Sequence, residues 1–330
     1  MVHCGLLTHL FSRFVMEFKG AARRKLSPEG CRERIPALVL LTGCLAVIVV
    51  FDVTFCSSRQ EDDFRQTIID QGSNAPSLDF EVFLSLQSPF LPEFNQATKK
   101  LVLPDRPVWI DVGANVEAEN KEGVTTLAFE PIPWFWEQLK SVQRRDVYAF
   151  PFGVGNENAL RKIQITRNGH SSSLLPTEAS GVAKLTGTSD SKSWDWRDAL
   201  ETTEALSIYV VRLEAVIDKL PVADIDYLKI DAQGYDLEVL KSAGKYLKSI
   251  RRVKLEAKAE GATGFYKGQP SPSEIIAFMQ DNGFRYSGSQ SSCCNEKLME
   301  VDMMFDNEAL HPSSNTDDFS RTSKFLPNYP

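Results

Sequence analysis

Residues 108–130 read VWIDVGANVEAENKEGVTTLAFE, two short apolar runs separated by a polar segment. The first run holds Asp111 near its end, with Gly113 close behind, and the second run ends at Glu130. Short apolar runs bounded by turn residues are typical of strands that are buried on both faces of a parallel sheet. We therefore expect two neighbouring parallel strands, each with a carboxylate near its end.

The pattern continues outward from this pair. Further strands are predicted over residues 146–154, over 160–166 as an edge extension, over 224–231 and over 251–257, and helices over 134–142, 235–244 and 271–284. Two last stretches, FRYSGSQSS from Phe284 and KLMEVDMMF from Lys297, predict an antiparallel pair. Alternating strands and helices predict an α/β fold, a doubly wound, mostly parallel sheet with helices on both faces and an antiparallel last strand.

Two connections depart from an ordinary α/β domain. Only about eight residues, Glu117–Val124, connect the Asn115 turn to the second strand. A crossover helix needs at least about ten residues, so we expect a loop or single turn there. Residues 168–206 are rich in Ser, Thr and Asp, and we interpret them as a long surface insertion over a substrate site.

The N-terminal region predicts a membrane anchor. Residues 35–51 read IPALVLLTGCLAVIVVF without a charge, and continued to Phe55 the segment would span about 31 Å as a helix, which matches a hydrocarbon core of about 30 Å. Residues 1–35 carry seven basic and three acidic residues. Because basic flanks stay in the cytosol, we expect a single-pass type II protein with a lumenal body in the Golgi or endoplasmic reticulum. A buried helix, a cleaved signal peptide and an organelle presequence are the alternatives.

Composition excludes other classes of protein. The net charge of −7 argues against a nucleic-acid-binding protein, which would need a basic surface. The six cysteines and four histidines form no CxxC pair or Cys/His cluster, so we expect no metal site. The expected organisation is a tail (1–34), an anchor in membrane lipid (35–55), a stem (56–105), a catalytic domain (106–306) and a disordered tail (307–330).

Three strand ends carry the candidate chemistry: Asp111 with Gly113 and Asn115, then Glu130, then Asp231. In open α/β sheets, ligands bind at the carboxyl ends of the strands. A glycine there allows close approach of the backbone, and a carboxylate after the second strand can accept hydrogen bonds from both hydroxyls of a ribose. We therefore expect these side chains to gather at one binding site.

The sequence resembles a known family at these same places. The stretches IDVGAN, AFEPIP, YLKIDAQGYDLEVLKSAG and KLEA, together with SSSLL at 171–175, are similar to the FkbM-type S-adenosylmethionine-dependent methyltransferases. The resemblance runs from Val108 to Phe305. It implies a Rossmann-like fold of the class I methyltransferase type, S-adenosylmethionine as cofactor, and a sugar or other small hydroxylated acceptor.

The resemblance also implies roles for individual residues. Asp111, Gly113 and Asn115 would line the methionine end of the cofactor, Glu130 would bind the ribose, and Asp231 would lie beside the methyl group. Asp231 is the first candidate for the general base. His170 is the second, because the pKa of histidine suits proton transfer near neutral pH.

One departure keeps other functions open. The family motif continues GANxG, but Glu117 stands at the second glycine, and Glu117 and Glu119 add negative charge near a carboxylate-bearing cofactor. A membrane-anchored, non-catalytic binding or scaffold domain with the same fold is therefore the alternative. A nicotinamide oxidoreductase would need G-x-G-x-x-G after the first strand, which the chain lacks.

Overall fold

The computed structural model describes residues 80–84, 91–142, 146–178, 199–293 and 300–310. All of them belong to one unit formed by residues 75–330. The expected tail and anchor (residues 1–55), most of the stem, residues 179–198 and residues 311–330 lie outside the described residues. Among the described residues, no helix has the length and apolar character needed to cross a bilayer.

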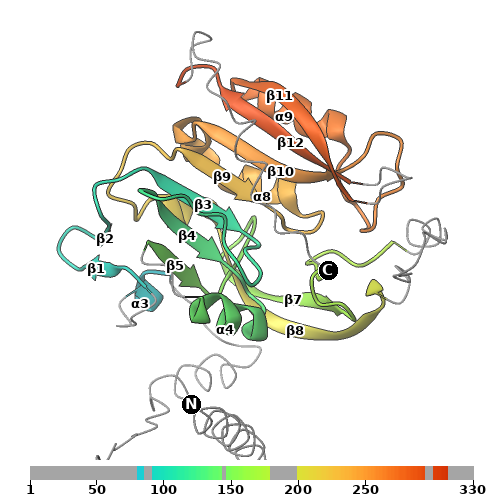
Figure 1. The fold of residues 1–330 in the computed structure, drawn as a ribbon, viewed down its shortest axis with the longest axis horizontal. Coiled ribbons are helices and arrows are strands. Elements are labelled where there is room, and N and C mark those ends of the chain that lie inside the picture. The colour runs from blue at the N-terminus through green and yellow to red at the C-terminus, as the bar shows by residue number, and fades with distance from the viewer. Residues whose placement is uncertain (1–79, 85–90, 143–145, 179–198, 294–299, 311–330) are drawn as a thin grey trace, which may run out of the picture. The chain divides into compact units, whose positions relative to one another are not determined.

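A seven-stranded sheet forms the centre of this unit, with the strand order β11-β12-β10-β9-β3-β4-β5 (Figure 1). Its strands are β3 (Val108–Val112), β4 (Thr125–Phe129), β5 (Val147–Phe150), β9 (Tyr227–Ile230), β10 (Arg252–Lys258), β11 (Phe284–Cys293) and β12 (Glu300–Asn307). β12 pairs antiparallel with β10 and β11, whereas the β10-β9, β9-β3, β3-β4 and β4-β5 pairs are parallel. The expected mostly parallel sheet with an antiparallel last strand is therefore confirmed.

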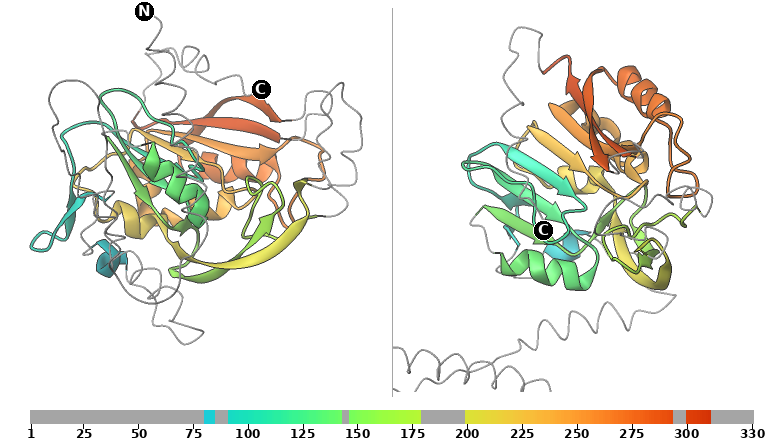
Figure 2. Two further views of the ribbon diagram at one scale, coloured as in Figure 1. Left: turned by 60° about the horizontal axis from the view of Figure 1, so that its bottom comes forward. Right: turned by 45° about the vertical axis from the view of Figure 1, so that its right-hand side comes forward.

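Helices cover the sheet on both faces (Figure 2). They are α4 (Pro133–Ser141), α7 (Leu213–Ile217), α8 (Asp236–Ser242) and α9 (Pro272–Asp281), with a 3-10 helix η1 (Gly244–Ser249) after α8. The β4-α4-β5 and β9-α8-β10 crossovers lead toward opposite edges of the sheet. Because such crossovers are right-handed, α4 and α8 lie on opposite faces.

Sequence pattern explains the central strands and the last helix. β4 is buried at every position, and Val108 and Ile110 of β3 are fully buried, as expected for strands covered on both faces. Helix α9 begins with a capping box in which Ser271 and Glu274 bond to each other's backbone N–H, an arrangement that satisfies two otherwise free donors.

The connection from β3 to β4 contains no helix, as its length predicted. Glu117 N donates to Ala114 O and Val124 N donates to Lys121 O, so two tight turns replace the crossover helix. Ala114 and Ala118 pack against Leu139 of α4 and fill the space above β4.

A second sheet corrects the interpretation of the middle of the chain. β7 (Ala159–Thr166) was expected to extend the edge of the main sheet, but it pairs with β8 (Thr202–Val211) in a separate three-stranded sheet with β6 (Gly153–Val154). The run 146–154 splits into two strands because Pro151 lacks an N–H for a ladder. Residues 202–206 lie in β8, not in a surface insertion, and the exposed polar side chains at 202–204 hid the strand pattern.

Part of the expected stem packs on the domain. It contains α3 (Phe80–Leu84) and the hairpin of β1 (Glu93–Asn95) and β2 (Lys100–Val102). Leu101 is 2% exposed, and its N–H donates to Lys219 O. Phe80 and Phe83 pack edge-on against Phe152.

Candidate cofactor and acceptor site

A cavity opens at the carboxyl ends of β3, β4 and β9. β3 lies between β4 and β9, so the strands that follow it in the chain are added on both of its sides. In such sheets a ligand usually binds at this point of reversal. The cavity is lined by five of the residues expected from the sequence, namely Gly113, Asn115, Glu130, His170 and Asp231. Four segments that are distant in the sequence therefore meet at one site.

Gly113 allows the loops after β3 and β9 to touch. Its φ of +73° lies in the left-handed region, and a Cβ at this position would lie 2.0 Å from the carbonyl oxygen of Asp231. Only glycine accepts both conditions. The backbone of the β3 loop therefore forms part of the cavity wall without a side chain.

Glu130 is a buried carboxylate at the end of β4. One oxygen accepts from the N–H of Asn115 at 2.9 Å and the other from the N–H of Ile132 at 2.8 Å. Burial raises its pKa to about 7, although these two donors oppose the shift. The two bonds fix the carboxylate at the cavity wall, and its remaining lone pairs can accept from a ligand.

Asp111 does not line the cavity, which corrects its expected contact with the cofactor. Its carboxylate is 2% exposed and accepts from the N–H of Glu119 at 2.7 Å. Lys229 Nζ lies 3.0 Å from the same carboxylate and donates to Gly113 O at 2.8 Å. Asp111 thus binds the ammonium of Lys229 in place of the ammonium of the cofactor. This ion pair holds the β3 loop against β9.

Asp111 and Lys229 differ in how strongly their surroundings favour the charged form. Burial opposes the positive charge of Lys229, but Asp111 and Asp231 outweigh it and raise the pKa of the lysine. For Asp111, burial dominates over the attraction of Lys229 and raises the pKa of the carboxyl group. The lysine is therefore the firmly charged partner.

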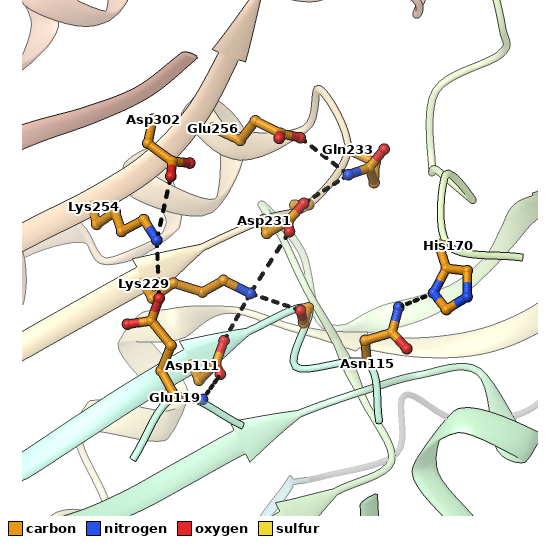
Figure 3. A network of polar contacts seen from close by, with 12 residues as sticks. Asp111, Asn115, Glu119, His170, Lys229, Asp231, Gln233, Lys254, Glu256 and Asp302 are labelled. Atoms are coloured by element: carbon orange, nitrogen blue, oxygen red, sulfur yellow. Dashed lines mark hydrogen bonds and ion pairs between the residues drawn. The ribbon is translucent and has the colours of Figure 1, made fainter. Parts of the chain in front are cut away.

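Asp231 lies at the mouth of the cavity with 36% of its side chain exposed. Gln233 Nε2 donates to Asp231 Oδ1 at 2.7 Å and to Glu256 Oε2 at 3.1 Å (Figure 3). Tyr266 donates to Ser171 O at 2.9 Å, and its hydroxyl also bonds to Gln233 Oε1. Gln233 therefore joins two carboxylates to a buried tyrosine and fixes their orientation.

His170 lies across the cavity from Asp231. Asn115 Nδ2 donates to His170 Nδ1 at 2.7 Å, and the imidazole stacks on Phe135 with 4.9 Å between ring centroids. Because Nδ1 accepts in this contact, the imidazole is the neutral tautomer that carries its proton on Nε2. Asn115 Oδ1 is buried and has no hydrogen-bond partner among the described residues, so one acceptor remains for a ligand.

The charge of Glu119 is compensated by a lysine, contrary to the expectation that Glu119 repels the carboxylate of the cofactor. Lys254 Nζ lies 3.0 Å from Glu119 and 3.4 Å from Asp302 of β12. The turn that replaces the first crossover helix is thus linked to β10 by the ion pair of Glu119 with Lys254. It is linked to β9 through Asp111, which accepts from Glu119 N and pairs with Lys229 (Figure 3).

Other sites of the unit are less suited to the expected chemistry. A larger cavity of about 440 Å³ is lined mainly by charged residues of α3, α7 and η1, but it is away from the carboxyl ends of the parallel strands. Among the described residues, no group of three or more His, Cys, Asp or Glu side chains is placed to hold a metal ion.

Sequence reasoning missed Lys229, Gln233 and Tyr266. A lysine inside the otherwise apolar run DYLKID was a usable signal, because a buried lysine needs a partner. Gln233 has a φ of +52°, and neither this nor its contact with Tyr266, 33 residues away, can be read from periodicity.

A sequence model described as the methyltransferase FkbM domain matches residues 111–286. This chain belongs to the FkbM methyltransferase family. The family consists of S-adenosylmethionine-dependent methyltransferases, and the match covers Asp111, Glu130, His170, Asp231 and the whole lining of the cavity.

Several solved structures are similar in fold at low identity. One is the TrmK protein of M. capricolum in complex with S-adenosyl-homocysteine, with 6% identity, a TM-score of 0.33, and coverage of 62% of this chain and 64% of that chain, less than two thirds of its length. Another is magnesium protoporphyrin IX methyltransferase from Synechocystis PCC 6803 with bound SAM, with 10% identity, a TM-score of 0.33, and coverage of 77% and 85%. The sequence matches no curated protein.

The residues of the cavity fit S-adenosylmethionine in chemistry. Glu130 would accept hydrogen bonds from the ribose hydroxyls, and Asn115 Oδ1 would accept one from the ammonium. Asp231 would lie beside the methyl group, and Ile132, Phe152 and Ile163 would give apolar surface to the adenine. The free space is about 80 Å³, below the roughly 300–1,000 Å³ of a typical pocket. Side chains of the lining must therefore move apart when a nucleoside binds. His170 is exposed, and among the described residues its movement would break only its contacts with Asn115 and Phe135.

Proposed function

We propose that this FkbM-family chain transfers a methyl group from S-adenosylmethionine to a hydroxyl group of a sugar or another small acceptor. The convergence of Glu130 and Asp231 on one cavity, with Gly113 opening the wall between them, carries this proposal. The hydroxyl acceptor is supported by the family and by the exposed carboxylate of Asp231.

S-adenosylmethionine, when bound, supplies a methyl group that is activated for in-line displacement. The residues of the chain orient the acceptor and remove its proton. Asp231 is the base: Gln233 holds its Oδ1, and Lys229 Nζ lies 3.8 Å from its Oδ2, so the carboxylate is held in place beside a positive charge. Orientation by the fixed carboxylate contributes to the rate, because a positioned acceptor reacts without a further entropy loss.

Titration of the full-length chain with S-adenosylmethionine by calorimetry tests this function. Glu130→Gln should weaken binding at least about tenfold, because a charge-assisted hydrogen bond is worth about 1.5–3 kcal/mol. Glu122→Gln, an exposed residue of the β3-β4 loop, should bind as the parent does. Equal affinities for parent and Glu130→Gln would remove Glu130 from the cofactor site.

The shortened β3-β4 connection favours one second candidate, a non-catalytic binding or scaffold domain. Without the crossover helix there is no helix N-terminus behind Gly113 to attract the cofactor's carboxylate. In that case the parent chain gives no heat with S-adenosylmethionine.

We further propose that residues 35–55 anchor the chain as a type II membrane protein, with the domain in the lumen of the Golgi or endoplasmic reticulum. The basic flank and the uncharged run over residues 35–51 support this topology. Ser189→Asn creates an Asn-Asp-Ser acceptor in a chain that has no natural Asn-x-Ser/Thr site, and we expect glycosylation of this variant in cells. Leu6→Asn, which creates an acceptor in the tail, should stay unmodified. Glycosylation of the second variant alone would reverse the topology.

A further inference from the structure

Three carboxylates share one face of the paired strands β10 and β12. Glu256 lies opposite Asp302 in the antiparallel register, and Glu300 precedes Asp302 by two residues. Leu255 and Met303, which alternate with them, are buried in the core on the other face. Because residues two apart on a strand point to the same side, these carboxylates form one acidic row at the carboxyl end of β10.

The acidic row continues into the proposed methyl-transfer site. Gln233 Nε2 donates to both Glu256 and Asp231, so these two carboxylates are close neighbours (Figure 3). A group bound between Glu256 and Glu300 would therefore lie beside the base.

The row has more carboxyl groups than the protein pairs with basic side chains. Asp302 is paired with Lys254. Lys258 lies opposite Glu300 in the register, but its side chain runs toward Gly264. Among the described residues, no basic side chain forms an ion pair with Glu256 or Glu300.

Glu300 is the clearest unsatisfied group. It is 7% exposed, and its Oε1 has no hydrogen-bond partner among the described residues. Burial and the nearby charges of Asp231, Asp236 and Asp302 raise its pKa to about 8. Buried polar atoms are nearly always bonded, so this oxygen indicates a missing partner.

We propose that Glu256 and Glu300 bind a protonated amine of the acceptor, which makes the substrate an amino alcohol such as an amino sugar. This inference rests on the proposed methyl transfer: the hydroxyl would lie at Asp231 and the ammonium at the acidic row. An ammonium has three donors, which can reach separate carboxylates. A metal ion fits less well, because its ligands must converge within about 2.6 Å, and no described group of three possible ligands does so.

Binding of an amine should release protons at pH 7. Glu300, with its pKa of about 8, is mostly protonated in the free protein, and a cation favours its ionised form. Burial and the charge of Asp231 raise the pKa of Glu256 in the same direction. The other groups facing them are Asp236, Lys258 and Tyr266; burial raises the pKa of Tyr266, so its hydroxyl stays neutral.

The test compares glucosamine with glucose, which differ in one amino group, on the full-length chain saturated with S-adenosylhomocysteine. We expect glucosamine to bind at least about tenfold more tightly and to release protons, measured as calorimetric heats that differ between buffers. Glu300→Gln should abolish both the preference and the release, whereas Glu308→Gln, exposed just after the same strand, should keep both.

Each outcome is decisive. Equal binding of the two sugars, or binding of neither, overturns the proposal, and so does a preference that survives in Glu300→Gln. Tight binding of Mg²⁺ that is lost in Glu300→Gln would make the row a metal site instead. If Glu300→Gln does not fold, Glu256→Gln serves in its place. Loss of S-adenosylhomocysteine binding in the parent would contradict the proposed function, not the acceptor class.

Discussion

Asp231→Asn should lower turnover by roughly 10²–10⁴-fold, the usual contribution of a positioned general base. The amide keeps the size of the side chain and its contact with Gln233 Nε2 through one oxygen, but it cannot take the proton of a hydroxyl. The affinity for S-adenosylmethionine should change much less. Single-turnover rates and calorimetric titrations of the same preparation measure the two quantities separately.

The alternative results assign a different role to Asp231. If affinity falls and turnover at saturating cofactor survives, Asp231 binds the ammonium of the cofactor and is not the base. Asp226→Asn is the matched control, since Asp226 immediately precedes β9, at the opposite end from Asp231, and pairs with Arg251. It should leave turnover unchanged.

Lys229→Met should destabilise the fold by about 3–5 kcal/mol, because it leaves the carboxylate of Asp111 buried without its partner. Denaturant unfolding of the variant and parent measures this difference. Without Lys229, the pKa of Asp111 in the folded state rises further above its value in the unfolded state. The buried carboxyl group is therefore neutral at low pH, and the folded state loses stability as the pH rises and ionisation is favoured. The loss of stability should therefore be smaller at pH 5 than at pH 8.

Two further variants separate charge from packing. Lys229→Met combined with Asp111→Asn removes both charges and keeps an acceptor for the N–H of Glu119, so it should recover part of the loss. Lys248→Met changes an exposed lysine and should stay within about 0.5 kcal/mol of the parent. A similarly small change for Lys229→Met would show that the pair does not hold the β3 loop.

The sequence was most informative where burial is complete. β3, β4 and β9 are mostly apolar runs, interrupted by Asp111 in β3 and by Lys229 in β9. The predicted strand ends brought Gly113, Asn115, Glu130 and Asp231 to one cavity. The shortened β3-β4 connection was also predictable, because chain length alone excludes a crossover helix. These features depend on local pattern and on the general geometry of parallel sheets.

The remaining features depend on contacts between distant segments. The first half of β8 begins with three exposed polar residues, Thr202–Glu204. Its ladder with β7 stabilises it, so the strand begins without an apolar pattern to detect. Asp111 had the right residue type for a cofactor ligand, but Lys229, 118 positions later, occupies it. Local sequence identifies which groups can bind; tertiary contacts decide which groups remain available.

The position of β3 in the sheet has a consequence for folding during synthesis. Its partner β4 follows within 20 residues, but its other partner, β9, begins at Tyr227. During synthesis, roughly eighty residues are added between the end of β5 and the start of β9. Throughout that interval, one edge of the β3-β4-β5 sheet has no partner strand. Open edges of this kind pair with other chains, and non-local pairing slows folding. The edge of β3 that β9 later covers therefore stays open to wrong pairing until β9 emerges, and the binding cavity cannot form before then.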